Sequence, residues 1–264
     1  MSKISVCAGC DVGSLTGKAV ILKNGSILSY GIVPTTPKPE RTARNAMDEA
    51  LKNGNLTLED IEFIVGTGYG RVKIPFANKE ISELTCHGKG AHSFLPSVRT
   101  IIDVGGQDCK VIKVNKDGKI LDFAMNDKCA AGTGRFLEVM AKTLELKLED
   151  LGPISLEAKN QAKITAQCSV FAETEVVSLM ADGTEVKDIV AGIHDTIASR
   201  IMTLVYRVGL EEDVTISGGV AKNIGVVAFL ENKMSLKTKK LPVDPQIIGA
   251  VGAALLAQEE LESK

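Results

Sequence analysis

The sequence predicts an α/β fold made of two similar halves, each with a loop suited to phosphate. Asp11-Val12-Gly13-Ser14 follows a short apolar run and precedes a second strand, and Asp103-Val104-Gly105-Gly106 repeats this order farther along the chain. A third glycine-rich turn, Gly132-Thr133-Gly134, opens an amphipathic helix. Glycine lets a backbone approach phosphate closely, and a helix N-terminus attracts phosphate. We therefore expect two halves, residues 1–98 and 99–264, around a shared cleft.

The pattern of the first half predicts three strands followed by two helices. Asn24-Gly25 is a strong hairpin signal because both residues accept positive φ, so it joins the second strand to the third. The proline-rich segment Pro34–Pro39 is the most linker-like stretch and precedes the first helix. The strands are expected at Ile4–Ala8, Thr16–Lys23 and Ser26–Val33, and the helices at Glu40–Asn53 and Ile81–Leu95.

Apolar runs separated by turn residues predict a second set of strands in residues 99–264. Lys116-Asp117-Gly118 turns the chain between two of them. The helical spacing of the apolar residues from Phe136 to Leu146 predicts a helix directly after the Gly132-Thr133-Gly134 turn. The remaining elements are expected as strands at Thr100–Val104, Cys109–Val114, Lys119–Asn126 and Val214–Ser217, and as helices at Ala172–Ala181 and Ile224–Met234.

Aspartates at the ends of the two matching strands are the candidate catalytic groups. Asp11 and Asp103 can hold Mg²⁺ through water or orient an attacking water, and Gln107 lies in the second loop. Glycine pairs at the strand ends suit contacts with phosphate and with a nucleoside. The candidate ligand-binding residues are Val12, Gly13, Ser14, Gly105, Gly106, Gly132, Thr133, Gly134, Gly218, Gly219 and Lys222. Ordinary tight turns are the alternative for each loop taken alone, because Asp-x-Gly turns are common in hairpins.

Length and composition restrict the class of protein. The 264 residues are 44% hydrophobic and 24% charged, so the chain is large enough to bury a core in each half. The formal net charge of −2 gives no basic excess for nucleic acid. No apolar segment reaches the length of a membrane span, and the start of the chain lacks a leader pattern. We expect a cytoplasmic protein that binds neither nucleic acid nor membrane.

The six cysteines fit free thiols, metal ligands or small buried side chains better than a disulfide framework. Cys7 and Cys10 have C-x-x-C spacing, but in a strand they point to opposite faces and cannot reach one metal. Cys86 and His87 diverge because they are adjacent on a helix, which argues against a metal site there. Cys109 is expected to be structural.

Cys129 and Cys168 both precede helices, and a helix N-terminus favours a thiolate. Two cysteines cannot complete a four-cysteine iron–sulfur cluster, whereas a two-fold dimer would supply four ligands around its axis. Two buried thiols are the alternative, and spacing alone does not favour the cluster over it.

Several segments together resemble the activator component of 2-hydroxyacyl-CoA dehydratases, within a wider group of ATP-dependent activators and benzoyl-CoA reductase ATPase subunits. The resemblance covers nearly the whole chain. Its most specific part is the Asn126–Phe136 block, because so long a run does not match by chance. The matching segments are residues 11–14, 67–71, 81–87, 102–108, 125–136, 167–173 and 217–221.

The resemblance implies the duplicated nucleotide-binding fold of sugar kinases, heat-shock chaperones and actin, with the C-terminal helix able to pack on the N-terminal half. It implies a homodimer with one [4Fe–4S] cluster held by Cys129 and Cys168 of both chains. Hydrolysis of ATP to ADP with Mg²⁺, assisted by Asp11, Asp103 and Gln107, would drive one low-potential electron to a partner iron–sulfur protein such as a 2-hydroxyacyl-CoA dehydratase. Ferredoxin or flavodoxin would be the electron donor.

The chain departs from the family pattern at a few positions, none of which removes a cluster ligand or a phosphate loop. Cys10 stands where an aliphatic residue is usual, and Leu15-Thr16-Gly17-Lys18 stands where small residues are common. An ATP-dependent reductase of a double-cubane iron–sulfur protein is therefore an alternative. More distant alternatives are a kinase of the same superfamily, for whose substrate domain the chain leaves little room, and a non-catalytic nucleotide-binding regulator, against which Cys129 and Cys168 argue.

Overall fold

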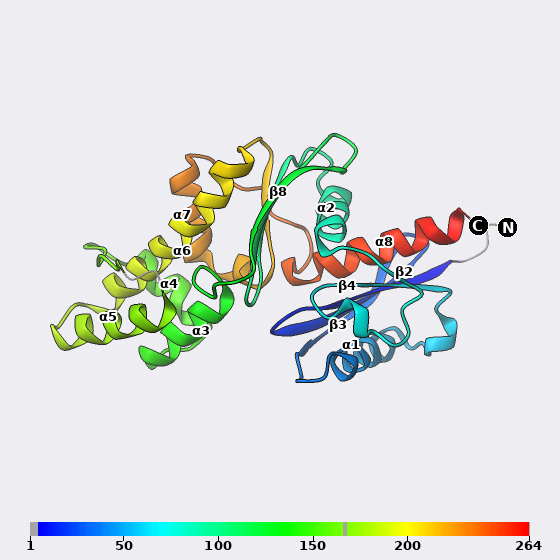
Figure 1. Ribbon diagram of the computed structural model, residues 1–264, viewed down its shortest axis with the longest axis horizontal. Helices are drawn as coiled ribbons and strands as arrows, with labels where there is room; N and C mark the ends of the chain where they lie inside the picture. The colour runs from blue at the N-terminus through cyan, green and yellow to red at the C-terminus, as the bar shows by residue number, and fades with distance from the viewer. Residues whose placement is uncertain (1–4, 166–167, 264) are drawn as a thin grey trace.

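The structure, a computed structural model, describes residues 5–165 and 168–263 and contains two β-sheets (Figure 1). The five-stranded sheet has the order β3-β2-β1-β4-β5, and the four-stranded sheet has the order β8-β7-β6-β9. In both sheets three consecutive strands pair antiparallel, and a later strand pairs parallel with the first of them. This repeated order confirms the predicted α/β fold and its duplication.

Each predicted strand and helix is present, but four further elements, at Phe63–Thr67, Lys79–Glu80, Leu151–Leu156 and Val186–Val208, were not predicted. The first half contains β1 (Val6–Val12), β2 (Thr16–Lys23), β3 (Ser26–Pro34), α1 (Pro39–Gly54), β4 (Phe63–Thr67), β5 (Lys79–Glu80) and α2 (Glu83–Phe94). The second half contains β6 (Thr100–Val104), β7 (Cys109–Val114), β8 (Ile120–Asn126), α3 (Gly134–Thr143), α4 (Leu151–Leu156), α5 (Ser169–Ala181), α6 (Val186–Val208), β9 (Val214–Ser217), α7 (Ile224–Met234) and α8 (Ile248–Glu262). Short 3₁₀ turns lie at Leu58–Asp60, Arg71–Lys73, Leu148–Asp150, Gly219–Lys222 and Pro245–Ile247.

The first strand differs from its predicted position. The sequence places it at Ile4–Ala8, where Ile4 lies outside the described residues, whereas β1 continues to Val12. The strand is longer because β2 pairs with β1 along its full length, with Asp11 opposite Lys18. Asp11 therefore lies inside a strand and next to a lysine, rather than in a loop after the strand.

Two helix boundaries also differ from prediction. The helix predicted to reach Leu146 is α3, which ends at Thr143, and Glu145 then takes a left-handed backbone with φ of +55°. Leu146 still packs against the core of the second half, which accounts for the apolar spacing past the helix end. The helix predicted from Ala172 is α5, which begins at Ser169, directly after Cys168.

The last helix lies on the first sheet. Figure 1 shows α8, in red, running along the five-stranded sheet and beneath α2. Its small residues form two core clusters with side chains of β1, β2, β4 and α2, and this small-residue face is Ala250, Ala253, Ala254 and Ala257. Because these side chains are short, α8 approaches both the sheet and α2 closely.

Replacing Gly252 with alanine is expected to destabilise the protein by roughly 3 kcal/mol, because core overpacking costs energy of this order. A Cβ at Gly252 would lie 1.8 Å from the carbonyl oxygen of Cys86, a backbone atom that cannot rotate away. Gly88→Ala is the matched control, since a Cβ there meets Val114 at 3.5 Å and alanine favours a helix. Urea unfolding measures both; equal midpoints would contradict the close α2–α8 contact.

Candidate active site

A cleft of about 1110 Å³ lies between the two sheets and is lined by residues from both halves. Both predicted phosphate loops open into it, together with the loop after β9 and the start of α3. The predicted site residues that line the cleft are Asp11, Val12, Gly13, Ser14, Asp103, Gly105, Gly106, Gln107, Gly134, Gly218, Gly219 and Lys222. Residues far apart in the sequence therefore meet at one surface.

The two phosphate loops touch each other at Gly106. A Cβ at Gly106 would lie 2.5 to 2.9 Å from side-chain atoms of Leu15, so a larger residue would push the first loop away. The first loop is held by Thr35, whose hydroxyl donates to the carbonyl of Gly13 (2.8 Å). Both loops are thus held against each other at the surface of the cleft.

Asp103 is an almost fully buried carboxylate that lines the cleft. Ser217 Oγ donates to Asp103 Oδ1 over 2.7 Å, and His87 Nδ1 lies 3.2 Å from the same oxygen. Lys110 Nζ lies 3.1 Å from Asp103 Oδ2. Burial alone would raise the pKa of Asp103, but His87 and Lys110 outweigh it and hold that pKa well below its usual range.

Lys110 connects several carboxylates. It stands opposite Asp103 in the β6–β7 register, forms an ion pair with Asp108, and has its Nζ 3.8 Å from Glu83 Oε1. Burial would lower the pKa of Lys110, yet Asp103, Asp108 and Glu83 more than offset this and raise it. The lysine is therefore a fixed buried cation, because its deprotonation would leave three carboxylates without the positive charge that neutralises them.

Asp11 carries the equivalent position in the first half. Its Oδ2 lies 3.3 Å from Lys18 Nζ. A Cβ at Gly68 would lie 2.3 Å from Asp11 Oδ1, and one at Gly249 would lie 3.1 Å from Oδ2. The backbones of these two glycines therefore approach the carboxylate closely. We use "cleft floor" below for Asp11, Lys18, Glu83, His87, Asp103, Asp108 and Lys110.

The loop after β9 forms the far wall of the cleft. Gly218 has φ of +85°, and a Cβ there would lie 2.3 Å from the carbonyl oxygen of Val104, so only glycine fits. Lys222 Nζ lies 2.6 Å from Asp244 and donates to Gln246 Oε1 over 2.7 Å. Asn223 caps α7 by accepting two backbone N–H groups. These bonds hold the wall rigid beside the phosphate loops.

Gly132 and Thr133 do not line this cleft, unlike their predicted neighbour Gly134. Thr133 is fully buried and its hydroxyl donates to the carbonyl of Ala130. Gly132, with φ of +89°, faces a separate cavity of about 460 Å³, where a Cβ would meet Arg200 at 3.3 Å. Of these three residues, only Gly134 therefore lines the cleft. Gly132 lines the second cavity together with Cys129, and Thr133 is bonded to Ala130, the residue after Cys129.

The start of α3 is hydrogen-bonded to the second phosphate loop. The N–H of Gly134 donates to the carbonyl of Gly105 (2.9 Å), and the N–H of Arg135 donates to the carbonyl of Gly106 (2.8 Å). These bonds use backbone donors that a helix N-terminus leaves without intrahelical partners. The phosphate loop and the turn that follows Cys129 are thus mechanically joined.

The cysteines divide by exposure. Cys7, Cys10, Cys86 and Cys109 are buried, whereas Cys129 is partly exposed and Cys168 is exposed. Cys7 and Cys10 enter different core clusters on opposite faces of β1, as predicted. Burial raises the pKa of the Cys86 thiol to about 12, which makes it a poor thiolate.

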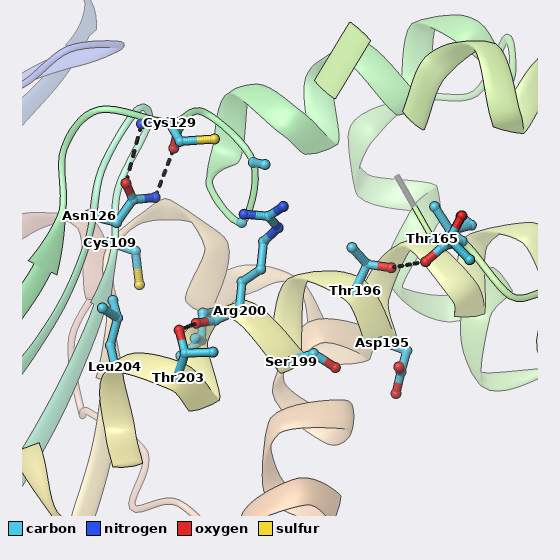
Figure 2. A pocket seen from close by; sticks show the side chains of 14 residues that line it. Cys109, Asn126, Cys129, Thr165, Asp195, Thr196, Ser199, Arg200, Thr203 and Leu204 are labelled. Atoms are coloured by element: carbon cyan, nitrogen blue, oxygen red, sulfur yellow. Dashed lines mark hydrogen bonds between the residues drawn. The ribbon is translucent and has the colours of Figure 1, made fainter. Parts of the chain in front are cut away.

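Cys129 lies at the edge of the second cavity. Figure 2 shows Asn126 bonded to the backbone of Cys129 and Arg200 extending from α6 toward the same turn. Asn126 Nδ2 donates to the carbonyl of Cys129 (2.9 Å), and Asn126 Oδ1 accepts its N–H (3.2 Å). Within residues 5–165 and 168–263, no three His, Cys, Asp or Glu side chains form a group that could hold a metal ion.

Comparison with known proteins assigns the family. Residues 8–257 match the family model described as the BadF/BadG/BcrA/BcrD ATPase family. The chain belongs to the BadF/BadG/BcrA/BcrD ATPase family. The activator of lactoyl-CoA dehydratase from Anaerotignum propionicum is 46% identical over 256 residues, which cover 97% of this chain and 98% of that protein.

Solved structures of related proteins have the same fold. Component A of (R)-2-hydroxyglutaryl-CoA dehydratase from Acidaminococcus fermentans matches with a TM-score of 0.93 at 43% identity, over 98% of this chain and 99% of that chain. The activator of 2-hydroxyisocaproyl-CoA dehydratase from Clostridium difficile with bound ADPNP gives 0.93 at 43% identity, over 98% and 96%. A ROK-family glucokinase from Streptomyces griseus, 13% identical with a TM-score of 0.57 over 97% and 100%, shares the fold alone.

This assignment to an ATPase family agrees with the ATP binding that the resemblance implies. It also confirms the predicted resemblance and the nucleotide-binding fold related to that of sugar kinases. None of the described helices combines the length and the apolar character that crossing a bilayer requires.

Sequence reasoning missed five polar residues of the cleft floor: Lys18, Glu83, His87, Asp108 and Lys110. Two of them had a readable signal. Lys110 follows a phosphate loop at the start of a mostly apolar strand, and Lys18 likewise interrupts the strand after the first loop. In each hairpin the antiparallel register places the lysine opposite the aspartate of the neighbouring strand. Glu83 and His87 lack such a signal because the docking of α2 decides where they point.

Proposed function

We propose that this protein is an ATPase that uses hydrolysis to drive one low-potential electron from a [4Fe–4S] cluster, shared by a homodimer, to a partner iron–sulfur protein. The observation that carries the proposal is the exposure of Cys129 and Cys168, since the other four cysteines are buried. Related proteins named as activators of lactoyl-CoA and 2-hydroxyisocaproyl-CoA dehydratases support a 2-hydroxyacyl-CoA dehydratase as the partner. Ferredoxin or flavodoxin is the proposed electron donor.

The donor set of one chain fits half of a cluster. Cys129 and Cys168 are free thiols with solvent access, and each stands ahead of a helix. Two chains related by a two-fold axis would supply the four thiolates that a [4Fe–4S] cluster requires. Such a cluster, when bound, accepts and releases one electron at a time. The part of this chain is to hold it with Cys129 and Cys168 and to fix the Cys129 turn through Asn126.

The cleft floor also fits Mg²⁺ bound to nucleotide phosphates. Its four carboxylates outnumber its two lysines, so an added divalent cation would balance the charge. Mg²⁺ keeps several waters and is held by phosphates with few carboxylates. Asp11 would therefore hold it through water, in agreement with the lack of a group of three ligands among the described residues.

The remaining cleft residues suit the other parts of ATP. Ser14, Gln107 and the backbone of Gly105 and Gly106 would contact phosphates, because they lie where the two loops meet. The wall from Gly218 to Lys222 would contact the adenosine. A nucleotide placed this way touches both halves, and its terminal phosphate lies against the loop joined to α3.

The coupling from nucleotide to cysteine would pass through α3. Because Gly134 and Arg135 donate to carbonyls of the second phosphate loop, a loop that moves on loss of the terminal phosphate would carry the start of α3 with it. The turn from Cys129 to Thr133 directly precedes this point. ATP can shift the cysteine side only if its affinity differs between the two arrangements.

Protein purified without oxygen is expected to be brown and to bleach quickly in air, at different rates with ATP and with ADP. A cluster on a dimer axis needs exposure to reach its partner, and the same exposure admits oxygen. Loss of the cluster would also weaken the dimer, because the ligand set exists only in the assembled form. Visible absorbance and light scattering recorded in parallel measure both effects.

Two results would count against this proposal. Colourless anaerobic protein would show that no cluster is bound. Identical bleaching with either nucleotide would show that nucleotide state does not reach Cys129, and the route through Gly134 would have to be abandoned.

A further inference from the structure

The cleft floor contains four carboxylates, and they differ in how many hydrogen bonds and ion pairs they form. Asp103 has one oxygen bonded to Ser217 and near His87, and the other near Lys110. An oxygen that already accepts short bonds from fixed donors is poorly placed to take a proton from water. Asp103 is therefore an anchor for its neighbours rather than an acceptor facing the cleft.

Asp11 is also enclosed. Lys18 lies against one of its oxygens, and the backbones at Gly68 and Gly249 approach both. Its side chain is only 7% exposed. This carboxylate suits a fixed negative charge near the phosphates and Mg²⁺.

Glu83 differs from both aspartates. It is the first residue of α2, lines the cleft, and has a side chain that is 20% exposed, against 3% for Asp103. Lys110 lies 3.8 Å away, a charge contact that is longer than a hydrogen bond. Its carboxylate oxygens therefore keep room to accept a hydrogen bond from a water in the cleft.

The chemistry of Glu83 agrees with its position. Burial raises the pKa of Glu83, and Lys110 lowers it in part. A carboxylate with a raised pKa accepts a proton more readily, which is the usual adjustment of a general base. The charged groups that act on it come from several elements: Lys110 of β7, Asp108 of the second loop, His87 of α2 and Asp11 of β1.

We propose that Glu83 is a catalytic residue that orients the water attacking the terminal phosphate and accepts its proton, with Lys110 as the positioning residue. This deepens the proposed function and rests on it. The water oxygen forms the new bond to the γ-phosphorus, and the bond from that phosphorus to the bridging oxygen breaks. The bond electrons leave with ADP, and the water proton passes to Glu83 and then to phosphate or solvent. No oxidant or reductant takes part.

Glu83→Gln is expected to lower kcat for phosphate release by at least about 100-fold, the usual minimum for loss of a general base. ADPNP affinity should stay within about threefold, because glutamine keeps the size and polarity of the side chain. The matched control is Glu80→Gln, since Glu80 is exposed on β5 three residues earlier. Hydrolysis by Glu83→Gln within threefold of the parent would overturn the assignment.

The pH profile separates a catalytic from a structural role. The parent should lose activity as pH falls through the pKa of Glu83, because only the ionised carboxylate accepts a proton. This acid limb should vanish in Glu83→Gln. Lys110→Met should move the limb to higher pH, because Lys110 lowers the pKa of Glu83, and Lys110→Arg should restore it. An unchanged acid limb in folded Glu83→Gln would contradict the proposal.

Failure of this inference and failure of the proposed function are distinguishable. Iron content and electron delivery to an iron–sulfur acceptor are measured on the same preparations as phosphate release. Parent protein that hydrolyses ATP but delivers no electron would count against the proposed function and leave the Glu83 result standing. Parental hydrolysis in Glu83→Gln overturns the role of Glu83 alone.

Discussion

Replacing Cys168 with alanine is expected to remove all iron from anaerobically purified protein, whereas the parent should hold about four irons per dimer, the content of one cubane. Cys129→Ala should do the same, because each chain contributes only two thiols that are not buried and the loss of either removes two of four ligands from the dimer. Iron analysis and visible absorbance measure the result. Thermal unfolding shows whether each variant is folded.

Cys86→Ala is the matched control for this experiment. Its thiol is also free, but it lies fully buried between α2 and α8, and burial raises its pKa to about 12. This variant should keep the full iron content and colour. Full iron content in Cys168→Ala would contradict the assignment of the ligands. Loss of iron in Cys86→Ala would contradict it as well.

Asp103→Asn is expected to slow ATP hydrolysis by about 100-fold or more while changing nucleotide affinity little. The substitution keeps the shape of the side chain and a bond to Ser217, but it removes the charge that holds Lys110 and His87. Removing one preorganised electrostatic group from an active site typically costs 10²- to 10³-fold in turnover, as order-of-magnitude values. Single-turnover phosphate release and ADPNP titration measure the two effects separately.

Asp117→Asn is the control for the loss of one negative charge, since Asp117 lies in an exposed turn between β7 and β8. Turnover in Asp103→Asn equal to that of the parent would exclude Asp103 from the hydrolytic site. Loss of ADPNP binding with the fold intact would instead assign Asp103 to nucleotide binding.

Local signals in the sequence predicted most of the elements, but not β4, β5, α4 or α6. The Asn24-Gly25 turn joins β2 to β3 as expected, because its backbone preference needs no distant partner. The two Asp-x-Gly loops both reach the cleft for a similar reason, since each lies at the end of its own hairpin. Cys129 and Cys168 were separable from the buried cysteines because each precedes a helix.

The sequence did not indicate which residues of the Gly132-Thr133-Gly134 turn would line the cleft. Gly134 donates to the second phosphate loop, whereas Gly132, with a positive φ, lies beside Arg200 of α6. A glycine pattern indicates that a backbone can bend, and it does not indicate which way. The direction depends on α6, which comes much later in the chain.

The sequence by itself predicted the α/β fold, the glycine loops that line the cleft and the two cysteines ahead of helices, because each of these depends on residues close together in the chain. Only the tertiary structure decided the cleft floor. Glu83 and His87 reach Asp103 and Lys110 because α2 packs on α8 and the second sheet, so the last helix of the chain helps to set where these charges lie. Burial energy fixes that packing, and no local pattern in residues 81–95 encodes it.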